Sequence, residues 1–349
     1  MDLARADGLW RAEAGCLQGL RILYGQTGRD GEWARLITTI TPDFTDPATE
    51  GPLPGREEEW GVITSHRVLL AMETRDWATA TTLQNAVIAW DRDRAAAALA
   101  TVTASLTPGQ RNQIRNLAVD IHDLGNILLL QKDPGCLPSF QEALTLLQRM
   151  GDRRAEAEAA LALGNAYLQV PGLRDLDQAE HWFQRSLSLH PDSDRYGRAA
   201  CHNQLGSVAL DRFDDARAAG EAAPVLAELL NAALGYYQQA LNLTRADDHQ
   251  SRAIAENQLG LIYGRAGDTG QALRHYQQSI RHKEARGDIY GAGRTRFNIA
   301  ILLARDGRIS DALLYARAAL GNFQQAGPGA DTDAADAEQL ITDLQQPSH

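Results

Sequence analysis

The alternation of apolar and polar positions predicts an almost entirely helical chain. The pattern is clearest between residues 257 and 288, where Leu259, Ile262 and Tyr263 recur at the three- and four-residue spacing of one helical face. Residues 267–270, Gly-Asp-Thr-Gly, then break the pattern with residue types that tolerate turn geometry. A second apolar stripe follows at Ala272, Tyr276, Ser279 and Ile280. The stretch therefore predicts two amphipathic helices joined by a tight turn.

Small residues within this stretch have a predictable packing role. We expect Gly260 and Ala272 to let the two helix backbones approach closely, while Tyr263 and Tyr276 fill the space beside them. A larger side chain at Gly260 would then force the paired helices apart.

The same arrangement recurs along the chain, which indicates a repeat. The first helices carry Leu-Gly or equivalent pairs at Leu124-Gly125, Leu163-Gly164, Leu205-Gly206, Leu259-Gly260 and Ile299-Ala300. The second helices carry a small residue and another residue four positions later: Cys136 and Phe140, Ala179 and Phe183, Ala233 and Tyr237, Ala272 and Tyr276, Ala312 and Ala316. The pairs are 39, 42, 54 and 40 residues apart. The spacing of 54 indicates an insertion at residues 211–228, which we expect to project as a short extra helix without contributing to the core.

The first hundred residues predict helices of a more divergent kind. The apolar pattern favours hairpins formed by residues 9–24 with 32–40, and by 57–73 with 77–90, and an alanine-rich helix continuing over 94–105. Asp76 is the expected N-cap of the second helix in the second hairpin. The proline-rich residues 41–55 predict a loop, either packed over the first turns or forming a contact surface. We therefore expect N-terminal hairpins at 1–105, an array of about five hairpins at 106–326, and a capping helix and tail at 327–349.

The order Leu259-Gly260, Tyr263, Ala272, Tyr276 resembles the tetratricopeptide repeat, whose pattern is W-x2-L-G-x2-Y followed by A-x3-F. The long period is similar to the arrays of kinesin light chains and adaptor proteins, and to the repeat sensor halves of STAND-type signalling ATPases. This resemblance implies an all-α fold, a right-handed α-α superhelix of antiparallel helical hairpins. It also implies a non-catalytic scaffold or sensor with a protein or peptide partner, such as an ATPase or protease of a signalling system.

The resemblance also implies where a partner would bind, because such arrays line a concave groove with their first helices. The expected groove residues flank the Leu-Gly pairs: His122, Asn126, Asn165, Gln169, Asn203, Ser207, Asn257, Arg265, Arg294, Asn298 and Arg305. An amide side chain both donates and accepts hydrogen bonds, so a row of asparagines can bind an extended peptide backbone. The alternative is that these amides cap turns or lie solvated on a helix face.

Charge adds a second candidate feature. The chain has a net charge of −11, which argues against a general nucleic-acid coat. The segment from Arg265 to Arg308, however, contains nine cationic and only four anionic residues. Arginine suits carboxylates and phosphates, so this end offers an alternative function, an accessory module that binds an acidic, phosphate-bearing or nucleic-acid ligand. A solvated helix face would give the same composition.

Signals for catalysis, cofactors or membranes are weak. No G-x-x-x-x-G-K-[ST] motif is present, and Cys201 and His202, as neighbours on a helix, would point in different directions. His275 and His282 are seven residues apart and could share a face, but no metal-ligand motif accompanies them. Three widely spaced cysteines, an acidic start and no long apolar run favour a cytoplasmic protein. We therefore expect neither an enzyme nor a cofactor.

Overall fold

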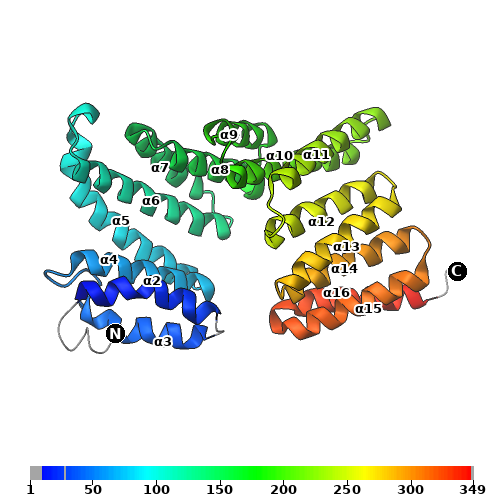
Figure 1. Ribbon diagram of the computed structural model, residues 1–349, viewed down its shortest axis with the longest axis horizontal. Coiled ribbons are helices and arrows are strands. Elements are labelled where there is room, and N and C mark those ends of the chain that lie inside the picture. The colour runs from blue at the N-terminus through cyan, green and yellow to red at the C-terminus, as the bar shows by residue number, and fades with distance from the viewer. Residues whose placement is uncertain (1–9, 27–28, 347–349) are drawn as a thin grey trace. The chain divides into compact units, whose positions relative to one another are not determined.

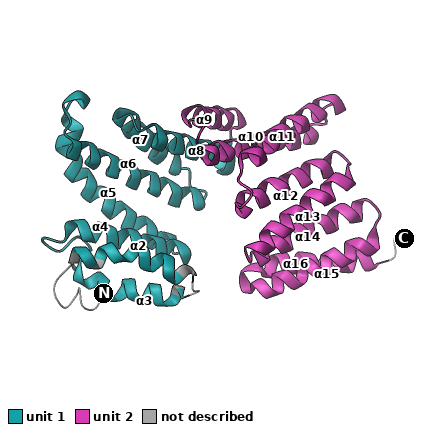
Figure 2. Cartoon of the chain, viewed as in Figure 1, with its two compact units in different colours: residues 1–174 teal, residues 175–349 magenta. Residues whose placement is uncertain are grey.

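The computed structural model describes residues 10–26 and 29–346, which form helices joined by short turns (Figure 1). The β-structure in these ranges is limited to one isolated bridge between Thr45 and Pro52. The all-α array of helical hairpins is confirmed. The chain divides into two compact units, residues 1–174 and 175–349, which Figure 2 colours separately. No helix among the described residues is both long and apolar enough to span a bilayer.

The described residues of unit 1 form seven α-helices, each packed against its neighbour in sequence. Their bounds are α2 Trp10–Gln26, α3 Asp30–Ile40, α4 Glu57–Glu73, α5 Trp77–Ala100, α6 Pro108–Leu130, α7 Cys136–Met150 and α8 Arg153–Gln169. The expected hairpins α2/α3 and α4/α5 are confirmed, and Asp76 caps α5 by accepting from the Thr79 amide at 3.1 Å. The alanine-rich segment extends α5 without a break as far as Ala100 and ends before residue 105.

The proline-rich loop between α3 and α4 belongs to the core of unit 1. Phe44 is completely buried in a cluster with Trp60 and Trp33. The Trp60 indole Nε1 donates to the backbone oxygen of Glu50 at 3.1 Å, which ties the loop to α4. Of the two roles left open by the sequence, the packed linker is therefore the one that the structure supports.

Two carboxyl groups meet between α5 and α6. Asp91 is buried, and it faces Asp120, whose backbone oxygen accepts from Gln84 Nε2 at 2.8 Å. Burial raises the pKa of Asp120 to about 8, and its hydrogen bond with Asp91 and the charges of Asp91 and Asp123 add to this effect. Asp120 therefore keeps its proton at neutral pH and can donate it in the hydrogen bond to Asp91.

This pair predicts a loss of stability as pH rises from about 4 to about 8. The folded-state pKa of Asp120, about 8, lies above the ordinary value of about 3.9, so the folded chain holds a proton that the unfolded chain releases. The stabilisation is complete below the ordinary pKa and is lost as pH rises through the folded value. Asp120→Asn keeps a neutral side chain and should remove this dependence, so the variant should gain stability relative to wild type as pH rises from about 4 to about 8, by several degrees in melting temperature, and the gain should level off above about pH 8. Thermal unfolding between about pH 4 and 9 measures it, with Asp93→Asn, an exposed carboxylate on α5, as control. A melting difference that does not vary with pH would contradict the raised pKa of Asp120.

Between residues 175 and 346, unit 2 forms eight α-helices. Their bounds are α9 Leu176–Leu189, α10 Arg195–Ala218, α11 Ala223–Leu243, α12 His249–Arg265, α13 Thr269–Ala285, α14 Ile289–Arg305, α15 Ile309–Ala326 and α16 Asp331–Gln345. The hairpins α10/α11, α12/α13 and α14/α15 have the most extensive contacts of the unit, and α16 covers α15. The expected capping helix is thus present, and its Ala337 is buried beside Phe323.

Short Gly-Asp turns separate the helices of unit 2. Gly267 and Gly287 have φ angles of +82° and +71°, in the left-handed region where glycine avoids steric cost. The following residues, Asp268 and Asp288, cap the next helices by accepting from backbone amides at 2.9 and 2.8 Å. Each turn therefore ends one helix and starts the next by local chemistry alone.

The predicted packing of the Leu-Gly pairs is confirmed. A Cβ atom on Gly260 would lie 2.6 Å from the Tyr276 ring, and one on Gly206 would lie 2.6 Å from the Tyr237 ring. In unit 1, a Cβ on Gly125 would lie 2.5 Å from Phe140. These glycines let the aromatic side chain of the second helix lie directly against the first helix.

The prediction for the insertion at residues 211–228 is wrong. These residues form no separate helix, because α10 continues through Ala218 and α11 begins at Ala223. The segment contains no helix breaker before Gly220, and Pro224 then occupies the first turn of α11. Phe213 is also buried, in a cluster with Leu230 and Tyr237, so the insertion contributes to the core.

Candidate functional site

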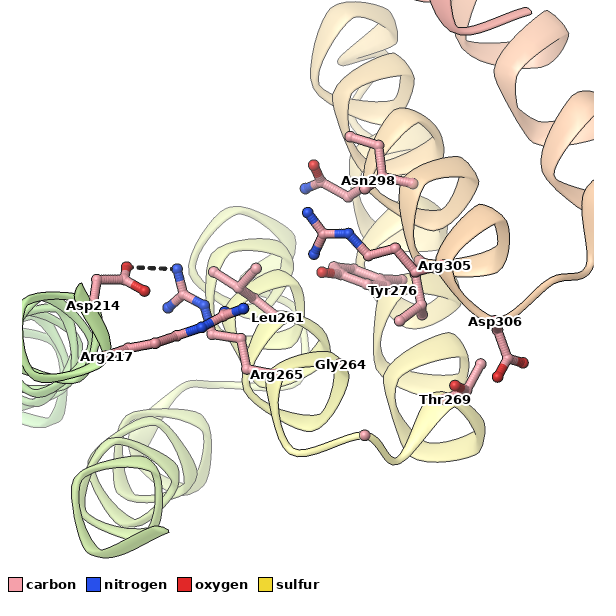
Figure 3. Close-up of a pocket in the computed structure, with 13 residues that line it drawn as sticks. Asp214, Arg217, Leu261, Gly264, Arg265, Thr269, Tyr276, Asn298, Arg305 and Asp306 are labelled. Atoms are coloured by element: carbon pink, nitrogen blue, oxygen red, sulfur yellow. Dashed lines mark hydrogen bonds and ion pairs between the residues drawn. The ribbon is translucent and has the colours of Figure 1, made fainter. Parts of the chain in front are cut away.

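One cavity of unit 2 is rich in arginine. It has a volume of about 470 Å³ and lies between α10, α12, α13 and α14 (Figure 3). The lining residues, which we call the arginine pocket, are Asp214, Arg217, Leu261, Gly264, Arg265, Gly267, Thr269, Tyr276, Asn298, Ile301, Leu302, Arg305 and Asp306. Three guanidinium groups thus face two carboxylates, which favours an anionic ligand.

Arg265 is the best-positioned arginine of the pocket. Its Nη2 donates to Asp214 Oδ2 at 2.7 Å, and its guanidinium lies 5.6 Å from the centre of the Phe213 ring. Its Nη1 is enclosed and has no hydrogen-bond acceptor among the described residues. Because an enclosed donor without an acceptor is costly, a ligand oxygen at this atom would be favourable.

Two further arginines approach the same space from different helices. In Figure 3 the side chains of Arg217, on α10, and Arg305, on α14, both reach toward the pocket. Within residues 10–26 and 29–346, neither of them forms an ion pair with a carboxylate. Both charges therefore remain available to a ligand.

Tyr276 supplies a neutral donor to the pocket wall. Burial raises the pKa of its phenol to about 12, although the charges of Arg265 and Arg305 act in the opposite direction. The hydroxyl group therefore stays protonated near pH 7 and can donate a hydrogen bond. The sequence indicated only a core-filling role for Tyr276, and the structure gives it both roles.

A close approach of helices shapes the pocket floor. A Cβ on Gly264 would lie 3.2 Å from Leu302 Cδ1, so glycine at this position allows α12 to pack against α14. Leu302 lines the pocket together with Leu261 and Ile301, which form an apolar wall beside the arginines. The pocket can thus receive a group that combines a negative charge with apolar surface.

The structure brings three of the expected groove residues together in this pocket: Arg265, Asn298 and Arg305. Arg294 is exposed and lies outside it. Asn257 has its Oδ1 bonded to Thr295 Oγ1 at 3.1 Å, which fixes its amide.

Asn203 and Ser207 lie next to each other on α10. The Ser207 hydroxyl lies 2.9 Å from the Tyr237 hydroxyl and donates to the Asn203 backbone oxygen at 3.2 Å. The Asn203 Oδ1 atom is enclosed and has no donor in the described part of the chain.

The expected groove residues of unit 1 form two local pairs. Asn126 Nδ2 lies 3.2 Å from His122 Nδ1, and the His122 ring packs against Phe140. Gln169 lies 3.5 Å from Asn165 and accepts from Lys132 Nζ at 3.3 Å. Their role in binding stays a prediction.

The sequence did not identify Asp214 and Arg217 as site residues. Both belong to the insertion that lengthens α10, and only their direction on that helix places them in the pocket. The available signal was a pair of arginines, Arg212 and Arg217, within an otherwise acidic and alanine-rich insertion.

Comparison with known proteins supports a helical-repeat fold. The tetratricopeptide repeat family matches residues 226–285, which include most of α11 and all of α12 and α13. No curated protein sequence matches the chain.

Several solved structures are similar in fold. Aspartyl phosphate phosphatase F from Bacillus subtilis has a TM-score of 0.55 and 12% identity over 80% of this chain and 81% of its own. A Rap protein complexed with competence and sporulation factor has a TM-score of 0.54 and 12% identity over 93% and 83%. The apo quorum sensor NprR from B. thuringiensis has a TM-score of 0.53 and 13% identity over 99% and 84%. The protein is therefore an all-α array of helical hairpins whose residues 226–285 match the tetratricopeptide repeat family.

Proposed function

We propose that the chain is a non-catalytic module that binds a protein or peptide partner and receives an anionic group of that partner in the arginine pocket. The observation that carries this proposal is the enclosed Arg265 Nη1, which lacks an acceptor beside the two unpaired arginines Arg217 and Arg305. A carboxylate has two oxygens whose spacing matches a guanidinium fork, so it can bridge such donors.

The rest of the pocket favours a peptide over a nucleic-acid backbone. The apolar wall of Leu261, Ile301 and Leu302 can bury a side chain, while the Asn298 amide can bond a peptide group. A volume of about 470 Å³ exceeds what a carboxylate alone would fill. The net charge of −11 also opposes extended contact with phosphates.

The similar structures add support of a general kind. One of them, the Rap protein, is complexed with competence and sporulation factor, and another, NprR, is a quorum sensor. Arrays of this fold can therefore hold another molecule. We extend this property to the present chain as part of the proposal, with an ATPase or protease of a signalling system as one kind of partner.

The remaining amides would contact the partner backbone. Asn257 is held by Thr295, so it is pre-oriented, whereas Asn203 has an unsatisfied Oδ1 that a peptide N–H could satisfy. In unit 1, the pairs His122 with Asn126 and Asn165 with Gln169 would act in the same way. Each lost amide contact would cost about 0.5 to 1.5 kcal/mol of affinity.

An array of synthetic peptides tests the anionic group. Each peptide would be paired with a version in which Asp and Glu become Asn and Gln and the C-terminus is amidated. We expect the wild-type protein to retain only charged versions, and Arg265→Gln/Arg305→Gln to bind them at least about tenfold more weakly. The variant should also show a flatter dependence of binding on salt, because fewer charges are screened. Circular dichroism confirms that the variant is folded.

Arg294→Gln is the matched control, because Arg294 is an exposed arginine on the same helix as Arg305 but outside the pocket. The proposal would be contradicted if the wild-type protein retained charged and neutral peptides alike. It would also be contradicted if Arg294→Gln weakened peptide binding as much as Arg265→Gln/Arg305→Gln does. Binding of oligonucleotides that is lost in Arg265→Gln/Arg305→Gln would instead support the alternative of a nucleic-acid ligand. Capture of the natural partner and mass spectrometry would then establish its identity.

A further inference from the structure

A second cavity of unit 2 lies between α12 and α13 and is built from different residues. It has a volume of about 400 Å³ and shares no lining residue with the arginine pocket. The lining residues, which we call the histidine cavity, are Arg252, Glu256, Gln271, Arg274, His275, Gln278 and His282. None of these side chains is aliphatic. The chemistry of the cavity is therefore that of a charged, strongly hydrogen-bonding ligand.

The two histidines of the cavity each have one ring nitrogen engaged. His275 Nδ1 lies 2.7 Å from Glu256 Oε2, and its ring stacks on Tyr263 at 5.2 Å. His282 Nδ1 lies 2.9 Å from Nδ1 of His249, at the start of α12. In both cases the contact orients the ring and leaves Nε2 without an assigned partner.

The two arginines also keep free donors. Arg274 uses its Nε to donate to Gln271 Oε1 at 3.1 Å, and its two terminal nitrogens remain available. The Arg252 side chain has no hydrogen bond or ion pair within the described ranges. Burial lowers the pKa of His282, and the nearby charges of Arg252 and His249 lower it further, which places Arg252 beside that ring.

The facing imidazoles of His249 and His282 can change their protonation when an anion binds nearby. When both rings are neutral, one Nδ1–H donates to the other Nδ1, and only one of the two rings carries a proton on Nε2. A single added proton leaves this hydrogen bond intact and gives both rings an Nε2–H. A second added proton would set two N–H groups against each other across 2.9 Å and break the bond. An anion in the cavity would therefore favour the singly protonated pair.

We propose that the histidine cavity binds a phosphate monoester group, held by Arg252 and Arg274 and by the Nε2 groups of His275 and His282. A doubly charged phosphate has several acceptor oxygens and matches two guanidinium forks together with imidazole and amide donors. The lining of the histidine cavity is entirely polar, which distinguishes it chemically from the arginine pocket, whose apolar wall suits a peptide side chain. The proposal does not depend on the proposed function of the arginine pocket.

The other charged groups around the cavity are compatible with an anion. Glu256 is the one carboxylate in the lining, and His275 is its partner. Asp248 caps α12 and lies near Arg286, and Asp247 forms an ion pair with Arg245. No set of three or more histidine, cysteine or acidic residues is placed to hold a metal ion in the part of the chain that the structure describes. An oxyanion is therefore the better match for these donors.

Phenyl phosphate and inorganic sulfate are suitable probes, with benzoate as a planar control of similar size. Calorimetry on the full-length Arg265→Gln/Arg305→Gln protein, whose arginine pocket is disabled, should show saturable binding of phenyl phosphate and much weaker binding of benzoate. Sulfate keeps its double charge across the range from about pH 8 to pH 6, so its affinity should rise as pH falls, because protonated imidazoles add donors. In NMR spectra of the wild type, the ring signals of His275 and His282 should shift on titration with phenyl phosphate.

Arg252→Gln and Arg274→Gln should each weaken phenyl phosphate binding by about tenfold. Arg294→Gln, which replaces an exposed arginine outside both cavities, should leave it unchanged. Binding that is lost in Arg305→Gln but kept in Arg274→Gln would overturn the proposal, because it would place the phosphate in the arginine pocket. So would unshifted histidine signals in the wild type, a result that needs no variant to fold.

Discussion

Replacing Phe213 by alanine should lower the free energy of unfolding of unit 2 by about 3 to 5 kcal/mol. The Phe213 side chain is only 4% exposed and packs in one cluster with Leu230 and Tyr237 of α11 and Leu259 of α12. Its removal would leave a cavity at the junction of α10, α11 and α12. Denaturation by urea, followed by circular dichroism, measures the change.

Val225→Ala is the matched control, because Val225 lies in the same insertion but is 40% exposed. It should change the stability by less than about 0.5 kcal/mol. If Phe213→Ala were as mild as this control, the insertion would be a projecting element and not part of the core. Loss of Phe213 should also weaken anion binding, since its ring lies against the Arg265 guanidinium.

The second large effect is expected at the close contact between α12 and α13. Gly260→Ala should destabilise the chain by about 1 to 3 kcal/mol, because the new Cβ would lie 2.6 Å from the Tyr276 ring. The gain in helix propensity would offset about 1 kcal/mol at most. A comparison of the melting temperatures of the variant and the wild type shows directly whether the substitution destabilises the chain.

Gly235→Ala supplies the opposite expectation within the same unit. Gly235 lies inside α11, and a Cβ there would meet nothing within 4 Å, so alanine should stabilise by about 0.5 to 1 kcal/mol. A Gly260→Ala protein that melts at or above the wild-type temperature would show that Tyr276 moves aside without cost. Gly206→Ala, which faces Tyr237 at the same distance, repeats the test in the neighbouring hairpin.

Much of the fold could be predicted because its information is local. The Gly-Asp turns at residues 267–268 and 287–288 end and start helices without distant contacts, and the apolar spacing of each helix marks its buried face. The Leu-Gly pairs also predicted their aromatic partners, since each partner lies in the next helix along the chain.

The course of the insertion could not be predicted in the same way. Its alanine-rich composition favours a helix, but composition does not show whether the residues start a new helix or lengthen existing ones. The outcome depends on Gly220, which ends α10 with a φ of +77°. A single glycine with few other turn residues around it is a weak signal.

The arginine pocket was predictable only in part. The surplus of positive charge pointed to Arg265 and Arg305, but Arg217 comes from a helix 48 residues before Arg265. The angle at which each helix packs determines whether these side chains meet, and the sequence does not contain that angle in any local pattern. The histidine cavity shows the same limit, because His275 and His282 have partners on another helix.

The arginine pocket draws its charged side chains from three successive hairpins, with Arg217 on α10, Arg265 on α12 and Arg305 on α14. Adjacent hairpins pack directly, so small rotations at two successive interfaces add up between α10 and α14. A ligand that bonds to Arg217 and Arg305 together would hold those rotations at one value. A bound ligand would thus fix the local curvature of unit 2. The orientation of another surface on α10 or α14 would then depend on whether the pocket is occupied.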